Sequence, residues 1–225
     1  MTTTPYYADG QVTLYLGDCR EVTEWLAADV LVTDPPYGMG WKSGQTSYTA
    51  RNARVESVHG DDSTAVRDDA LALWGNRKPA VVFGTWRQPR PPRVTHRLIW
   101  HKAKTPPGVR PAAFYPAEEE VYLIGSGWTG KPIQNVIVTT EWRASVHGFV
   151  ARSGHPTPKP ESLMDVLVSK CPPGVIADPF AGSGSTLVSA RNLGRKAIGV
   201  EIDERYAERA ARRLAQDVLI TGAVG

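Results

Sequence analysis

The chain has 225 residues, of which 41% are hydrophobic and 22% charged, and a formal net charge of +3. This length can bury one substantial core and predicts a single domain over residues 1–225. Two cysteines, Cys19 and Cys171, form no CxxC pair, so neither a disulfide framework nor a metal site is indicated. The longest apolar runs fall far below the ~20 residues of a membrane span, and the start MTTTPYYADG lacks the features of a secretory signal. We therefore expect a soluble cytoplasmic protein.

In the first third of the chain, predicted strands alternate with predicted helices. VTLYL and DVLVT are typical of strands, REVTEWLAA of a short helix, STAVRDDALALWG of a longer helix and PAVVFG of a buried strand. Between them lies a polar, glycine-containing stretch at 38–62. A loop of about 25 residues inside a compact domain is typically a lid or a binding loop.

The segment from 86 to 155 is less regular, and the C-terminal third is regular again. HRLIWHK, EEEVYLIG and QNVIVTT are predicted strands between Pro/Gly-rich connections. After them we expect helices at 160–170, 184–194 and 203–218 and strands at 174–178 and 196–201. Strands separated by helices predict an α/β fold with a mostly parallel sheet and helices on both faces.

Residues 86–110 contain seven lysines and arginines and no acidic residue. One interpretation is a solvated, proline-stiffened loop around a short strand. The other is a surface for phosphate groups, where each cationic contact displaces condensed counterions. The segment alone leaves both interpretations open.

The stretch GVIADPFAGSGSTLVSARNLGRKAIGVEID, 174–203, has the order strand, glycine turn, helix, strand, acid. Small residues at Ala181, Gly182 and Gly184 let a ligand approach the backbone closely. The helix that begins near Ser183 to Ser185 directs its N–H groups towards whatever lies above the turn. The order therefore predicts a nucleoside-binding site.

The acids of this stretch indicate which nucleoside. Glu201 ends the second strand, where such folds place an acid against ribose hydroxyls. Leu187 stands where a dinucleotide motif has its third glycine, and Asp178 would repel a pyrophosphate but suits an ammonium group. The pattern favours S-adenosylmethionine (AdoMet) over NAD.

Four motifs together resemble one family. TDPPYG at 33–38 and ADPFAGSGSTL at 177–187, with HPTPKP at 155–160 and LGDC at 16–19, resemble the DNA amino-methyltransferases that modify adenine N6 or cytosine N4. The resemblance implies a Rossmann-like AdoMet-dependent methyltransferase fold. The order, with DPPY before the glycine loop, resembles the circularly permuted class called β, over residues 12 to about 217.

The resemblance implies catalytic roles for Asp34, Pro35, Pro36 and Tyr37. An exocyclic amine is a poor nucleophile because its lone pair is delocalised into the ring, and two acceptors on its N–H bonds would localise that pair. The Asp34 carboxylate and the Pro35 carbonyl would be these acceptors, since the prolines remove N–H donors from the turn. Tyr37 would stack on a base flipped out of the duplex. The alternative is a rigid strand-to-loop turn with a surface tyrosine.

The resemblance also implies residues that hold the cofactor. Asp18 and Cys19 would contact the adenine of AdoMet, although a Gly-Asp turn has an equally ordinary loop role. Thr157 and Lys159 would line the methionine end, and the alternative is a proline-stiffened helix entry with Lys159 solvated. Glu201 is the expected ribose ligand, while Asp203 is expected to cap a helix. The glycine loop and the catalytic turn add Asp34, Asp178, Phe180, Ala181, Gly182, Ser183, Gly184, Ser185 and Thr186.

We expect adenine N6 as the target, because in this family DPPY accompanies adenine more often than cytosine. Transfer to cytosine N4, RNA or a protein amide, and a non-catalytic AdoMet- or DNA-binding module, remain alternatives. Double-stranded DNA is the expected partner, a homodimer is expected and a metal is not. Residues 38–62 would cover the target base, and residues 103–155 would form a small inserted recognition region. The nucleic-acid candidates are Trp41, Lys42, Arg51, Arg54, Arg87, Arg90, Arg143 and Arg152.

Overall fold

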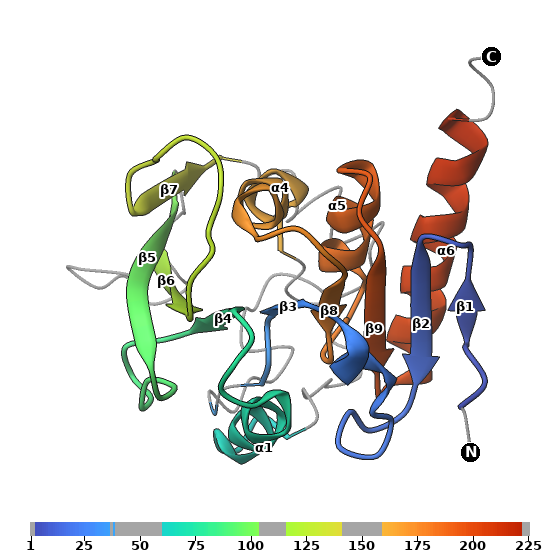
Figure 1. Ribbon diagram of the computed structural model, residues 1–225, viewed down its shortest axis with the longest axis horizontal. Helices are drawn as coiled ribbons and strands as arrows, with labels where there is room; N and C mark the ends of the chain where they lie inside the picture. The colour runs from blue at the N-terminus through green and yellow to red at the C-terminus, as the bar shows by residue number, and fades with distance from the viewer. Residues whose placement is uncertain (1–2, 37, 39–59, 104–115, 141–158, 222–225) are drawn as a thin grey trace, which may run out of the picture.

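The computed structural model describes residues 3–36, 38, 60–103, 116–140 and 159–221. These residues form one nine-stranded mixed sheet with the order β1-β2-β9-β8-β3-β4-β6-β5-β7 (Figure 1). The strands are β1 (Tyr7–Ala8), β2 (Val12–Leu16), β3 (Val30–Thr33), β4 (Ala80–Gly84), β5 (Val94–Lys102), β6 (Glu118–Ile124), β7 (Val136–Thr139), β8 (Ile176–Asp178) and β9 (Ala197–Glu201). The helices are η1 (Glu24–Ala27), α1 (Ala65–Trp74), α4 (Glu161–Lys170), α5 (Ser185–Asn192) and α6 (Glu204–Thr221).

The middle of the sheet is parallel, as the alternation of strands and helices predicts. Strands β2, β9, β8, β3 and β4 pair in parallel, each with its neighbour in that order. The predicted strands and helices are confirmed with boundaries close to those expected, except that REVTEWLAA forms only the short 3₁₀ helix η1. Strand β1, which was not expected, pairs antiparallel with β2. A two-residue strand has no periodicity from which a sequence pattern could predict it.

Helices cover both faces of the sheet (Figure 1). Val30 and Val32 of β3 pack into a core with residues of α4, α5 and α6. Leu31, between them, points to the opposite face and packs with residues of η1 and α1. Successive side chains of a strand point to opposite faces, so an entirely buried strand such as β3 must be apolar at every position.

The α1 face is held by two stacked indoles. The rings of Trp25 and Trp74 lie 5.8 Å apart at an interplanar angle of 9°. Trp25 is fully buried, and its Nε1 donates to the Cys19 carbonyl at 2.8 Å. The stack thus joins η1 to α1, and the hydrogen bond to Cys19 ties η1 to the turn after β2.

The chain changes direction between β3 and β8. After β3 it continues through α1 on one face to β4, and after β8 it continues through α5 on the other face to β9. Open α/β sheets bind ligands at such a switch point, outside the carboxyl ends of the strands. Asp34 and Asp178 lie at these two ends.

The expected recognition region at 103–155 contributes two strands to the same sheet. Strand β6 lies between β4 and β5 and is antiparallel to both, while β7 is parallel to β5 at the edge. Residues 104–115 and 141–155 of this region lie outside the described residues, as do 39–59 of the expected loop over the base. The roles of both regions stay predictions.

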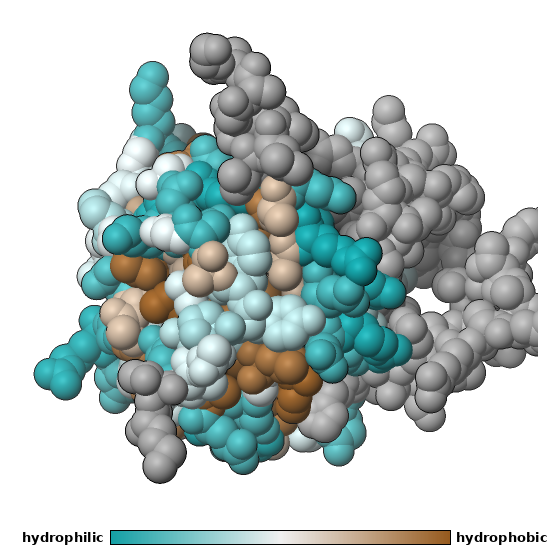
Figure 2. Space-filling view, turned by 90° about the vertical axis from the view of Figure 1, so that its right-hand side faces the viewer, coloured by the Kyte–Doolittle hydropathy of each residue, from teal (hydrophilic) through white to brown (hydrophobic). Residues whose placement is uncertain are grey.

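The surface next to β1 and α6 is mainly hydrophilic (Figure 2). Its apolar residues form small separate patches among teal and white residues. None of the described helices is long and apolar enough to cross a membrane. The expected homodimer stays a prediction.

Replacing Trp74 by alanine should destabilise the fold by about 3–5 kcal/mol, because it removes a buried ring and half of the indole stack. Leu73 is the matched control on the same helix, since its side chain is 43% exposed. Leu73→Ala should cost less than about 1 kcal/mol. Urea unfolding followed by circular dichroism measures both, and equal losses for the two variants would contradict the packing described for α1.

Candidate active site

A cavity of about 480 Å³ opens at the carboxyl end of the parallel strands. This volume lies within the range of small-molecule sites. Its walls come from the turn after β2, the end of β3, the glycine turn after β8 and the end of β9. On the other side the walls come from the ends of β4 and β5 and the start of β6, with Lys159 ahead of α4. The cavity thus extends across most of the width of the sheet.

The glycine turn is shaped by backbone conformations that favour glycine. Gly182 has φ +53° and Gly184 has φ +82°, both in the left-handed region. A Cβ on Gly184 would also lie 3.0 Å from the Cβ of Ala210 on α6. The turn can therefore bring its backbone close to a ligand while α6 packs against its other side.

Glu201 connects this turn to the start of α6 by hydrogen bonds. Its Oε2 accepts from the Gly182 N–H at 2.7 Å and its Oε1 from the Asp203 N–H at 2.8 Å. Burial raises the pKa of Glu201 to about 7. Asp203 in turn accepts from the Arg205 N–H at 2.9 Å, which confirms its predicted role as the helix cap. The expected contact of Glu201 with ribose stays a prediction.

Arg213 supports the turn from α6, a role that the sequence reasoning missed. Its guanidinium donates to the Ser183 carbonyl at 2.6 Å and to Glu161 of α4 at 2.8 Å. The residue stands in the run ERAARRLAQ, where several arginines share one amphipathic helix. Nothing in that run distinguishes the arginine that faces the turn from those in solvent.

Asp178 connects the two strand ends. Its Oδ1 accepts from the Thr33 hydroxyl at 2.7 Å and from the Phe180 N–H at 3.1 Å. The side chain is buried, which raises its pKa to about 6. A hydrogen bond across neighbouring strands thus fixes the Asp34-Pro35-Pro36 turn relative to the glycine turn.

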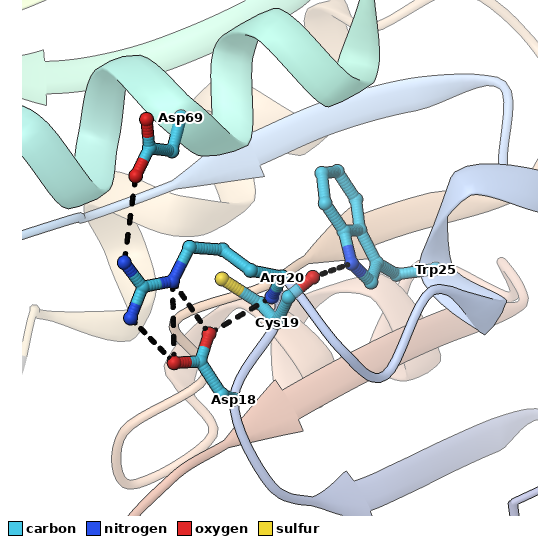
Figure 3. Close-up of polar contacts among 5 residues, drawn as sticks. All are labelled: Asp18, Cys19, Arg20, Trp25 and Asp69. Carbon is cyan, nitrogen blue, oxygen red and sulfur yellow. Dashed lines mark hydrogen bonds and ion pairs between the residues drawn. The ribbon is translucent and has the colours of Figure 1, made fainter.

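The LGDC turn forms the other end of the cavity. The Arg20 guanidinium pairs with Asp18 at 2.6 Å and also reaches Asp69 of α1 at 3.4 Å (Figure 3). Burial raises the pKa of the Cys19 thiol to about 12, so the thiol stays protonated at neutral pH. Arg20 was not among the sequence candidates, although it follows the motif directly.

The two carboxylate oxygens of Asp34 have different surroundings. Its Oδ2 lies 2.6 Å from the Lys159 Nζ, whereas its Oδ1 is buried without a hydrogen-bond partner among the described residues. Burial raises the pKa of Asp34, and the charge of Lys159 opposes that rise. Pro35 and Pro36 line the cavity beside it. One carboxylate oxygen is therefore occupied and the other can accept a donor.

Lys159 lies between two carboxylates. Besides Asp34 it contacts Glu119 Oε2 at 3.0 Å, and Glu119 also pairs with Lys102. Burial opposes the ionisation of Glu119, but the two lysines outweigh it and hold its pKa below the usual range. From the sequence, Glu119 is predicted only as part of a strand. A run of three acids inside an otherwise apolar strand was the available signal.

Much of the basic charge in 86–110 is paired within the protein. Arg97 and Arg90 approach Glu120 at 2.9 and 3.7 Å, and Arg93 donates to the Gly75 carbonyl. Arg87 stacks at 5.4 Å from the ring of Trp86, which is 64% exposed, and both line the cavity. A surface for phosphates in this segment stays a prediction.

The structure brings most of the described candidates together. Gly184 faces α6 and Arg90 faces Glu120, so neither lines the cavity. The candidates outside the described residues are Tyr37, Trp41, Lys42, Arg51, Arg54, Arg143, Arg152 and Thr157. The candidates that line the cavity are Asp18, Cys19, Asp34, Pro35, Pro36, Arg87, Lys159, Asp178, Phe180, Ala181, Gly182, Ser183, Ser185, Thr186 and Glu201.

Comparisons with known proteins agree with this geometry. A family model described as DNA methylase matches residues 117–212, which include α4, the glycine turn and β9. The type II methyltransferase M.ScaI of Streptomyces caespitosus is 28% identical over 93% of this chain and 83% of its own. Over the described elements the fold resembles TTHA0409, a putative DNA modification methylase from Thermus thermophilus complexed with S-adenosyl-L-methionine, at 26% identity, 91% and 95% coverage and a TM-score of 0.51. PvuII DNA methyltransferase (cytosine-N4-specific) is 15% identical, with 93% and 88% coverage and a TM-score of 0.62.

The fold is that of the AdoMet-dependent methyltransferases, as the sequence predicted. Within this class the comparisons support a DNA methyltransferase of the N6-adenine or N4-cytosine group. They do not distinguish the two bases. The expected cofactor agrees with the AdoMet complexes among the structural relatives.

The raised pKa values of Glu201 and Asp178 predict how stability depends on pH in the absence of ligand. Both carboxyls bind a proton more tightly in the folded chain than in the unfolded chain. Their contribution to the free energy of unfolding is therefore present at low pH and is lost as pH rises. For Glu201 the loss falls between the ordinary pKa of 4.5 and the folded pKa of about 7. Urea unfolding of the wild type and of Glu201→Gln across this window should show a shallower decline in the variant. The exposed Glu208→Gln should retain the wild-type decline, and an unchanged slope in Glu201→Gln would contradict the assignment.

Proposed function

We propose that this protein transfers a methyl group from S-adenosylmethionine to the N6 amine of an adenine flipped out of double-stranded DNA. The observation that carries the proposal is the buried Oδ1 of Asp34, which has no hydrogen-bond partner among the described residues. A buried acceptor without a partner costs about 1–3 kcal/mol. An incoming N–H donor would remove that cost, and an exocyclic amine supplies such a donor.

The turn is suited to accept hydrogen bonds and not to donate them. Pro35 and Pro36 have no N–H, so the only polar groups that they contribute are carbonyls. With Asp34 on one N–H of the amine and the Pro35 carbonyl on the other, the nitrogen lone pair would be directed away from the ring. In transfer the nitrogen gains the methyl group from the sulfonium and loses one proton, which the Asp34 carboxylate would accept.

The cofactor fits the other half of the cavity. Small residues of the glycine turn permit close approach, and Asp18 and Glu201, at the ends of the neighbouring strands β2 and β9, both line that half. Bound there, S-adenosylmethionine would supply an activated methyl group on a sulfonium, beside the Asp34 turn. Asp18, Cys19, Asp178 and Glu201 would orient it, and the buried strand ends would exclude water from the reacting atoms.

The finer features of the proposal follow from the sequence motifs. The strand that carries Asp34 precedes the glycine turn along the chain, which supports the permuted β class. Tyr37 would stack on the flipped base, and Trp86 with Arg87 would contact the DNA strand at the rim of the cavity. We further propose that the protein acts in the cytoplasm and as a homodimer.

The base is identified by one assay. Purified protein is incubated with isotope-labelled S-adenosylmethionine and unmethylated genomic DNA, and the digested nucleosides are separated. N6-methyladenine is the expected product. N4-methylcytosine would correct the base while retaining the chemistry, and transfer to RNA or protein alone would overturn the proposed substrate. No transfer to any acceptor would favour a binding module.

Replacing Asp34 by alanine should lower methyl transfer at least about 100-fold, because a group that contacts the reacting amine is lost. Binding of S-adenosylmethionine, measured by calorimetry, should change much less. Glu208→Ala is the control, since it removes a carboxylate from an exposed ion pair on α6. Loss of cofactor binding together with transfer in Asp34→Ala would show that the residue has been given the wrong role.

A further inference from the structure

Four ionisable side chains form a continuous chain through the inner wall of the cavity. Asp34 follows β3, Lys159 precedes α4, Glu119 lies on β6 and Lys102 ends β5. Their contacts run in that order, from Asp34 to Lys159, from Lys159 to Glu119 and from Glu119 to Lys102. These four side chains are two carboxylates and two ammonium groups, so their formal charges balance.

Lys159 is held in one place. Its side chain is 7% exposed, and its Nζ lies 4.9 Å from the centre of the Phe83 ring and 5.8 Å from that of Trp100. Two aromatic rings and two carboxylates thus surround a single ammonium group. A lysine so confined cannot follow a mobile ligand, and it fixes the groups that it contacts.

We propose that Lys159 and Glu119 are positioning residues for the Asp34 carboxylate. Lys159 occupies Oδ2 and leaves Oδ1 to the substrate amine, and Glu119 holds Lys159 at the distance that permits this. Glu119 does not touch the substrate and acts only through Lys159. This role rests on the proposed function. It differs from the contact with the methionine end of the cofactor that the family resemblance implied for Lys159.

The other three side chains of this network also shift the pKa of Asp34. The described charged groups around this carboxylate are Lys159, Glu119, Lys102 and, on β8, Asp178. Lys159 and Lys102 lower the pKa of Asp34, whereas Glu119 raises it. Removing Glu119 should therefore lower the pKa of Asp34, and removing Lys159 should raise it. A merely structural role for the two residues would not produce opposite shifts.

The test compares Glu119→Gln and Lys159→Gln with the wild type in the methyl-transfer assay. We expect kcat to fall about 10- to 100-fold in each, since a small displacement of a reacting group has effects of this size. The acidic limb of the kcat profile should move to lower pH in Glu119→Gln and to higher pH in Lys159→Gln. The KM for S-adenosylmethionine should change less than kcat in both variants. Glu208→Gln, on the exposed face of α6, should leave rate and profile unchanged.

A second measurement is independent of turnover. Carboxyl ¹³C NMR, with the Asp34 signal assigned by its loss in Asp34→Asn, should show the same opposite shifts of the Asp34 pKa in the two variants. Shifts in one direction, or no shift, would overturn the proposal even if the wild type methylates DNA. A large rise in KM for S-adenosylmethionine in Lys159→Gln, with the Asp34 pKa unchanged, would restore the cofactor role. A wild type without transfer but with the opposite shifts would overturn the proposed function and retain the positioning pair.

Discussion

The adjacency of β3 and β8 is the constraint on which the site depends. Asp34 directly follows β3 and Asp178 ends β8, and the hydrogen bond from Thr33 to Asp178 connects the two strand ends. Burial raises the pKa of both carboxyls. Burying two neighbouring carboxyl groups destabilises a fold unless each has polar partners. Lys159 pairs with Asp34, and the Thr33 hydroxyl and the Phe180 N–H donate to Asp178.

The elements of the fold could be predicted because their signals are local. An apolar run such as VLVT between polar neighbours, or the glycine turn followed by STLVSA, defines its own conformation. The two motif turns could also be placed together, since parallel neighbouring strands must end at the same edge. The pairing of β6 with β4 and β5 could not be predicted, because a continuous apolar run such as VYLI does not specify which strands lie beside it.

The residues that the sequence analysis missed act through contacts over long separations. Glu119 reaches Lys159 across 40 positions, and Arg213 reaches Ser183 across 30. Neither residue differs in kind from its neighbours, since one stands among three glutamates and the other among several arginines. A motif identifies the groups that meet a ligand. The groups that hold those side chains in place are selected by tertiary packing.

The order of the strands along the chain has a consequence for synthesis on the ribosome. Strand β3 obtains one neighbour, β4, within about fifty residues, but its other neighbour, β8, begins only at Ile176. The central strand therefore presents an unpaired apolar edge until β8 has been synthesised, and such edges favour aggregation of nascent chains. The same late step covers this edge and brings the glycine turn to the Asp34 turn, so a nascent chain acquires the cavity only when β8 has paired with β3.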